Sequence, residues 1–386
     1  MSDLKYVLGW NFYTMRFMGI WPQERKWKDL STYIVLMPVS AMLCFVCAPQ
    51  TINLLFIWGD FDLIIENLSM ANMTFTITLL KTIVFWSNGK RKYFTSLLTN
   101  MANDWRTVTG KEDRERMLKI ASITRTMSIR STVMSNGVVG TYVILRFFSM
   151  QDTEHRLLCR GYFPYDENAS PNYVLTFLGQ LVASFYAGTS YTAVDTFVGM
   201  LVLHVCGQLS NLSQELKNLQ ANTKLEFRTK LRDIVQRHEY LNRFAQTIET
   251  CFNVMLLAQM LSCTIQLCFQ CFQAIMSIDG EVNQLLIFQF LFLILYVVYV
   301  LLQLYLYCYV GERLSVESVK IADAAYDCDW YNLSVAEAKL LIIIMCRARL
   351  PLHITAGKFC TFTIELYSQI LKTSMGYISV LYAMRQ

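Results

Sequence analysis

Long apolar blocks, separated by polar and charged stretches, dominate the chain. Each block has roughly 20 or more residues, the length that a helix needs to cross a hydrocarbon core of about 30 Å. The blocks predict seven membrane-spanning helices, at approximately 31–57, 62–86, 127–149, 172–206, 250–276, 285–310 and 359–383. A shorter apolar run at 338–346 is too brief to span. The pattern therefore predicts an all-α membrane protein that forms one domain over residues 1–386.

Helical periodicity continues outside these blocks. An amphipathic stripe of leucines follows the fourth span, at Leu209, Leu212, Leu216 and Leu219, and it resumes with Leu231, Ile234 and Val235. Further on, Ser334 and Glu337 have the spacing of a capping box at the start of a helix. We expect cytoplasmic helices at approximately 207–245 and 311–358, which pack either within one subunit or as an anchor between subunits.

Composition and charge support the membrane assignment and fix an orientation. Hydrophobic residues make up 54% and charged residues 16% of the chain, whereas about a quarter is charged in an average soluble protein. With seven spans, 27 of the 34 lysines and arginines fall on one side and three on the other. The positive-inside rule then places the N-terminus in the cytoplasm and the C-terminus outside. A G-protein-coupled receptor, with its N-terminus outside, has the opposite orientation, so a metabotropic seven-span receptor is the weaker alternative.

Sequence motifs give no sign of enzymatic chemistry. The four histidines are far apart, and no glycine loop or zinc-protease helix is present. The cysteine pairs Cys44/Cys47 and Cys268/Cys271 lie in apolar helices, where cysteine acts as a small hydrophobe. We expect no enzyme activity, cofactor, metal site or nucleic-acid binding. A weak glycosylation sequon begins at Asn168, on the outer side, and is followed by Pro171.

Ionisable residues inside the predicted spans are costly and usually face the protein interior or water. Four of them lie near span ends, where snorkelling to the interface explains them; they are Glu66, Lys81, Arg130 and Arg146. Asp195 and His204 lie deeper in the fourth span. A buried polar cluster explains these two better than a proton path does.

The last span is unusually polar for a membrane helix. One of its faces is polar at the inner end and apolar at the outer end, and it carries Gln369, Thr373, Tyr377, Val380 and Met384. Such a face is typical of a contact between helices. It is equally compatible with a pore wall that ends in a hydrophobic constriction.

The outer halves of the second, third, fourth and sixth spans combine aromatic, methionine, small and hydroxyl side chains. Apolar walls with a few hydroxyls suit a small hydrophobic ligand, although ordinary core packing has the same composition. The candidate lining residues are Met70, Met73, Thr74, Gly137, Gly140, Thr141, Ile144, Leu181, Ser184, Phe185, Phe292, Tyr296 and Tyr299.

The order of elements in the C-terminal third resembles that of insect odorant receptors. The residues that carry the resemblance are Tyr326, Trp330, Tyr331, Pro351, the run "TAGKF" at 355–359 and Tyr377. A weaker match extends through "DTFVGMLVLHVCGQLSNL" in the fourth span. The loop after that span lacks the long insertion of the common co-receptor, so the chain resembles an odorant-binding (tuning) subunit.

This resemblance implies a ligand-gated, non-selective cation channel in the plasma membrane of sensory-neuron dendrites. The implied assembly is a heterotetramer with olfactory co-receptor subunits, and the implied partners are a small hydrophobic odorant, membrane lipids and permeating cations. In such channels the last helices line the pore. By position Val380 corresponds to the hydrophobic gate, Met384 flanks it, and Ala383 stands where the co-receptor usually has glutamine. A gustatory-type receptor channel is an alternative, and a transporter is a weaker one because paired broken helices are not apparent.

Overall fold

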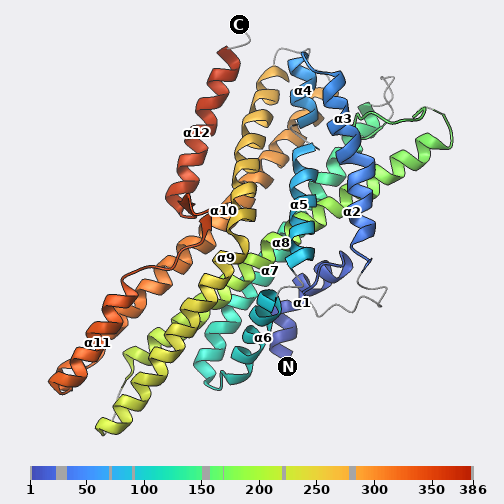
Figure 1. Ribbon diagram of the computed structural model, residues 1–386. Coiled ribbons are helices and arrows are strands. Elements are labelled where there is room, and N and C mark those ends of the chain that lie inside the picture. Colours follow the sequence, from blue (N-terminus) through green and yellow to red (C-terminus); the bar gives the residue numbers. More distant parts are fainter. Residues whose placement is uncertain are drawn as a thin grey trace.

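Long helices build almost the whole structure, a computed structural model that describes residues 2–22, 33–68, 72–88, 92–149, 157–167, 169–219, 223–277 and 284–383. They form an elongated bundle to which a two-stranded hairpin is added (Figure 1). In chain order the elements are α1 (Ser2–Phe17), α2 (Leu36–Met42), η2 (Leu43–Cys47), α3 (Ala48–Phe56), α4 (Phe61–Asn67), α5 (Met73–Asn88), α6 (Lys92–Thr107), α7 (Lys111–Ser149), α8 (Asn172–Lys217), α9 (Lys224–Ser277), α10 (Gln284–Asp327), η5 (Trp330–Asn332), α11 (Val335–Ala348), β1 (Thr355–Ala356), β2 (Cys360–Thr361) and α12 (Ile364–Ala383).

The predicted spans correspond to these helices with two differences. The second span is divided into α4 and α5, and the first contains a π-helical turn, η2, between α2 and α3. Four described helices are long and apolar enough to cross a membrane, namely Leu36–Phe56, Asn172–Lys217, Lys224–Ala274 and Leu286–Asp327, and Met73–Trp86 is a shorter apolar helix. Two helices that contain predicted spans, α7 and α12, are not among these four. Polar residues such as Gln369 and Lys372 interrupt α12.

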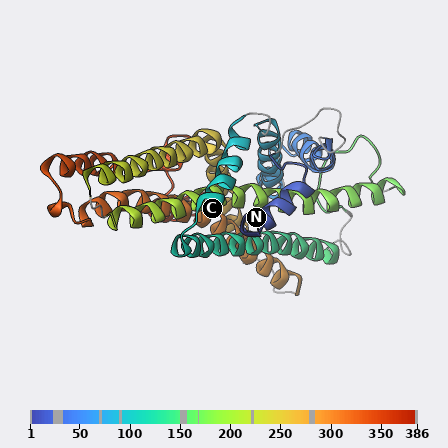
Figure 2. The same cartoon turned by 90° about the horizontal axis from the view of Figure 1, so that it is seen from below.

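The centre of the bundle is α8, which packs against α7, α10, α9, α5 and α2. Its most apolar stretch is completely buried, and Figure 2 shows it between α7 and α9. A helix surrounded by protein can carry polar side chains that lipid would not tolerate, because neighbouring helices supply their hydrogen-bond partners. Asp195 and Gln208 of α8 are both buried.

Beyond the membrane bundle, the ends of α8, α9 and α10 continue together with α11 as a narrower helical arm at the lower left of Figure 1. The leucine stripe packs inside this arm, since Leu209, Leu212 and Leu216 are fully buried. Leu231 and Ile234 of α9 are buried too, but Val235 is 44% exposed. Its predicted place in the stripe was wrong, because one residue further along a helix turns by about 100°.

A tight hairpin connects the arm to α12. The capping box at Ser334 and Glu337 starts α11 as predicted, and β1 pairs with β2 after Pro351 has ended that helix. Gly357 has φ +60° in the turn between the strands, and its N–H donates to the Asn253 carbonyl of α9 at 2.9 Å. The turn thus fixes the point from which α12 rises to the C-terminal end at the top of Figure 1.

Candidate functional site

A small cavity of about 70 Å³ lies among α5, α7, α8 and α10. Three aromatic side chains of α10 form one wall, and α7 and α8 form the facing walls. Its lining residues are Thr74, Phe75, Ser135, Val138, Val139, Tyr142, Cys159, Ser184, Ala187, Gly188, Tyr191, Phe292, Tyr296 and Tyr299. The cavity therefore lies in the region where the sequence predicted a ligand pocket.

Most hydroxyl groups around the cavity already have partners within the protein. Thr74 and Tyr296 share a hydrogen bond of 3.0 Å, and the Gln266 amide donates to the Thr74 hydroxyl at 3.2 Å. The hydroxyls of Ser135 and Ser184 donate to backbone carbonyls at 2.9 and 2.8 Å. The surface offered to a ligand is consequently aromatic and aliphatic, and it selects by size and shape.

Five of the predicted pocket residues line this cavity: Thr74, Ser184, Phe292, Tyr296 and Tyr299. Seven others lie outside its lining, namely Met73, Gly137, Gly140, Thr141, Ile144, Leu181 and Phe185, and Met70 lies outside the described residues. Phe185 and Ile144 are largely exposed on the bundle surface. Any role of these residues in ligand binding stays a prediction.

On α7, the residues that line the cavity lie on a different face of the helix from the predicted residues Gly137, Gly140, Thr141 and Ile144. The cavity faces Ser135, Val138 and Tyr142, which are spaced by three and four residues. The glycine at this wall is Gly188 of α8, and it allows α7 to pack closely: a Cβ there would lie 3.1 Å from the Ser135 Oγ atom. The spacing of Ser184, Gly188 and Tyr191 on one face of α8 could have indicated this wall.

A buried ion pair lies next to the cavity. The Lys81 ammonium of α5 is 2.5 Å from a carboxylate oxygen of Asp195 of α8, and the side chains are 1% and 0% exposed. The prediction that Lys81 snorkels to the interface was wrong, because a partner inside the bundle compensates its charge. The ammonium also lies 3.9 Å from the ring centre of Tyr191, which lines the cavity.

His204 belongs to a separate polar cluster. Its Nε2 atom is 2.8 Å from the Asp104 carboxylate of α6, which also accepts hydrogen bonds of 3.0 and 3.1 Å from the Tyr240 hydroxyl. Burial and the neighbouring carboxylate raise the pKa of Tyr240, so this phenol stays a neutral donor. Asp195 and His204 thus occupy two different buried clusters.

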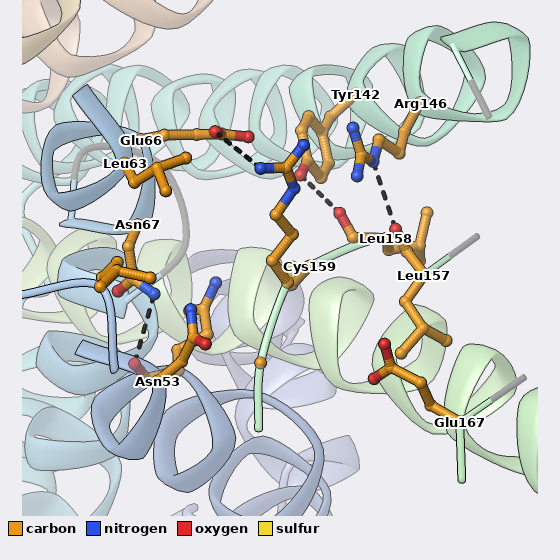
Figure 3. Close-up of a pocket in the computed structure, with 14 residues that line it drawn as sticks. Asn53, Leu63, Glu66, Asn67, Tyr142, Arg146, Leu157, Leu158, Cys159 and Glu167 are labelled. Atoms are coloured by element: carbon orange, nitrogen blue, oxygen red, sulfur yellow. Dashed lines mark hydrogen bonds and ion pairs between the residues drawn. The ribbon is translucent and has the colours of Figure 1, made fainter. Parts of the chain in front are cut away.

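A second, more polar cavity of about 230 Å³ lies beside the first, and both are lined by Tyr142 and Cys159. Figure 3 shows Tyr142 and Arg146 of α7 donating to the carbonyls of Leu158 and Leu157, at 2.7 and 3.2 Å. The Glu66 carboxylate forms an ion pair of 3.7 Å with the Arg160 guanidinium. Leu157 and Leu158 line the larger cavity, and Cys159 lines both. The predicted sequon at Asn168 lies outside the described residues.

Of the predicted polar face of the last helix, α12, the structure describes the side chains of Gln369 and Thr373. Gln369 and Thr373 are exposed, whereas Ile370 and Ser374 are buried. The remaining residues predicted for the pore are Tyr377, Val380 and Ala383 on the last turns of the helix, and Met384. Their side chains, and Met384 as a whole, lie outside the described part of the chain.

Comparison with known proteins gives consistent relatives. The family model described as 7tm Odorant receptor matches residues 60–375. Odorant receptor 13a of Drosophila melanogaster is 26% identical over 95% of this chain and 93% of its own length. The odorant receptor coreceptor of Anopheles gambiae is 30% identical over 42% of this chain and 33% of its own length.

Among solved structures, the insect olfactory receptor OR5 from Machilis hrabei in complex with eugenol has the same fold. It superposes with a TM-score of 0.84 at 14% identity, covering 98% of both chains. The structure of the same receptor without eugenol gives 0.84 at 16% identity, covering 98% of this chain and 97% of that one.

Proposed function

Because the chain belongs to the 7tm odorant receptor family, we propose that it binds a small hydrophobic odorant and that binding opens a cation channel. The proposed binding site is the small aromatic cavity among α5, α7, α8 and α10, called the inner cavity below. The family consists of receptors and not of enzymes, so the chain is an insect odorant receptor and a multi-pass membrane protein. Family membership also sets aside the gustatory and transporter alternatives.

The observation that carries the proposal is the small aromatic cavity with internally paired hydroxyls. A ligand in it gains mainly from burying apolar surface, about 25 cal/mol per Å², and from contact with the rings of Phe292, Tyr296 and Tyr299. Carboxylic acids and amines would lose hydration there without finding a charged partner on the lining. The favoured class is a small, weakly polar volatile.

For the channel, the support is α12. Its exposed polar face at Gln369 and Thr373 suits a water-filled path shared by four subunits, which would include olfactory co-receptor subunits. Val380 would be the gate, flanked by Ala383 and Met384, and alkali cations would flow inward across the plasma membrane of a sensory dendrite. Opening requires that the odorant bind the open arrangement better than the closed one.

The test is to record current from cells that express the receptor with a co-receptor, over a panel of eugenol, anisole, acetophenone and hexyl acetate. Ala187→Leu adds side-chain volume at a buried position of the cavity lining. Since one methylene in an apolar pocket changes discrimination about 10–200-fold, we expect the half-maximal concentration of the best agonist to rise at least about tenfold.

Val182→Leu is the matched control, because Val182 lies on the same helix with its side chain exposed. It should leave the dose–response curve unchanged. Equal curves for Ala187→Leu and the wild type, at equal surface expression, would place the odorant outside this cavity.

A further inference from the structure

Three contacts link the inner cavity to the base of α12 through the buried ion pair. The first is on the cavity side. Tyr191 lines the cavity, its ring lies 3.9 Å from the Lys81 ammonium, and its hydroxyl accepts a hydrogen bond from Gln259. Because the cation is attracted to the ring face, a ligand that shifts this ring also pulls on Lys81.

The second contact is the ion pair itself, which is only partly satisfied. Lys81 is bonded to one carboxylate oxygen of Asp195, and the other oxygen, Oδ2, is buried and accepts no well-formed hydrogen bond from the described residues. A buried carboxylate oxygen without a partner costs free energy. It can be satisfied if a nearby donor moves toward it.

The third contact supplies this donor. The buried hydroxyl of Tyr307 in α10 lies within reach of the Asp195 carboxylate and interacts with it, but the two groups do not have the geometry of a well-formed hydrogen bond. Its ring packs against Phe362 with ring centres 5.6 Å apart, and Phe362 lies two residues before the start of α12.

The base of α12 is fitted tightly to α10 at this point. A Cβ atom at Gly311 of α10 would lie 2.4 Å from the Phe362 carbonyl oxygen, so the two backbones are in direct contact. The Phe362 N–H also donates to the Ile354 carbonyl at 2.9 Å. A movement of Tyr307 is therefore passed to the segment that sets the direction of α12.

We propose that the Lys81–Asp195 pair is the coupling element between the odorant cavity and the channel helix. An odorant that displaces the Tyr191 ring draws Lys81 with it, and Asp195 turns to accept the hydrogen bond of the Tyr307 hydroxyl. Tyr307 and Phe362 then shift the base of α12. The proposal rests on the proposed function, and it names two hydrogen-bonding states of one buried carboxylate that odorant binding would interconvert.

The first test is Tyr307→Phe, which removes the hydroxyl and keeps the ring on Phe362. We expect the maximal odorant-evoked current to fall about tenfold, the effect of losing a hydrogen bond to a charged group. Odorant-induced thermal stabilisation of the purified receptor should persist, because the cavity is unchanged. Tyr305→Phe, two residues away with a half-exposed ring, is the control and should behave as the wild type.

The second test removes both charges with Lys81→Met/Asp195→Leu. Apolar replacement of a buried pair is often neutral for stability, so we expect normal surface expression and the same loss of current. Adding Tyr307→Phe to this double variant should cause no further loss of current, because the effects of substitutions within one network do not add. If the double variant does not reach the surface, Tyr307→Phe alone decides.

The outcomes separate the two proposals. The coupling is overturned if Tyr307→Phe has the maximal odorant-evoked current and the half-maximal odorant concentration of the wild type. It is also overturned if adding Tyr307→Phe to the double variant causes a full additional loss of current. If the wild-type receptor with a co-receptor responds to none of eugenol, anisole, acetophenone and hexyl acetate, and none of them stabilises it, the proposed function itself fails.

Discussion

Lys81 and Asp195 show how single residues are accommodated in the interior of this bundle. An ionised group costs several kcal/mol in a low-dielectric interior unless it is paired. The partners are 114 residues apart in the chain, so each depends on the folded bundle for compensation. Removing one of them alone would leave a buried charge, whereas removing both would not.

Gly357 is a second residue that the fold constrains strongly. Its φ of +60° is unfavourable for residues with a side chain, and a Cβ there would lie 2.6 Å from a methyl carbon of Leu257. We expect Gly357→Ala to lower the free energy of unfolding by roughly 2 kcal/mol, the upper end of the cost of a left-handed backbone. Thermal unfolding of the detergent-solubilised receptor measures it.

The control is Gly376→Ala in α12, where an added Cβ would meet nothing within 4 Å. Alanine is favoured over glycine in a helix by about 1 kcal/mol, so this variant should be at least as stable as the wild type. A Gly357→Ala receptor that unfolds at the temperature of the wild type would show that the turn can reshape around the methyl group.

Residue identity predicted part of the cavity and not its complete lining. Tyr296 and Tyr299 were found because they are one turn apart in an apolar span. The sequence predicts Gly137 and Gly140 of α7 because glycine leaves room, yet the glycine that lines the cavity is Gly188 of α8, where α7 and α8 pack closely. Which face of a helix meets a cavity depends on its packing partners, and the apolar pattern of a membrane helix hardly distinguishes its faces.

Among the elements, α8 and α12 differ most in how far other helices of the chain cover them. Protein surrounds α8 along its apolar stretch, whereas α12 packs mainly against α9 and α10. Apolar length alone therefore predicted both helices but not their neighbours. The polar residues of α12 gave the better signal, since a helix facing lipid on all sides would exclude Gln369 and Lys372.

The proposed role of α12 predicts the behaviour of its outer end. Val380→Gln would place a polar group at the proposed constriction and allow water to persist there. We expect a ligand-independent current several times that of the wild type, recorded with a co-receptor and normalised to surface expression. Met375→Gln, at an exposed position of α12, should leave the basal current unchanged. An unchanged basal current in Val380→Gln would count against this residue as the gate.

For the whole molecule, the distribution of charge predicts an orientation in the membrane. The side with 27 lysines and arginines should be cytoplasmic, which places the helical arm below the membrane and the end of α12 outside. We expect an epitope tag at the C-terminus to be labelled in intact cells, and a tag at the N-terminus only after permeabilisation. Surface labelling of the N-terminal tag would reverse the topology and favour the metabotropic alternative.

Among the described residues α12 packs mainly against α9 and α10, and this attachment has a consequence for the proposed assembly. A helix that packs against its own subunit along one side resists tilting weakly. In the proposed tetramer, most of the resistance to tilting of α12 would come from the neighbouring subunits around the pore axis. In that assembly, odorant detection and ion conduction would reside in separable parts of the complex. Substitutions around the odorant cavity of one subunit would then leave the common pore intact.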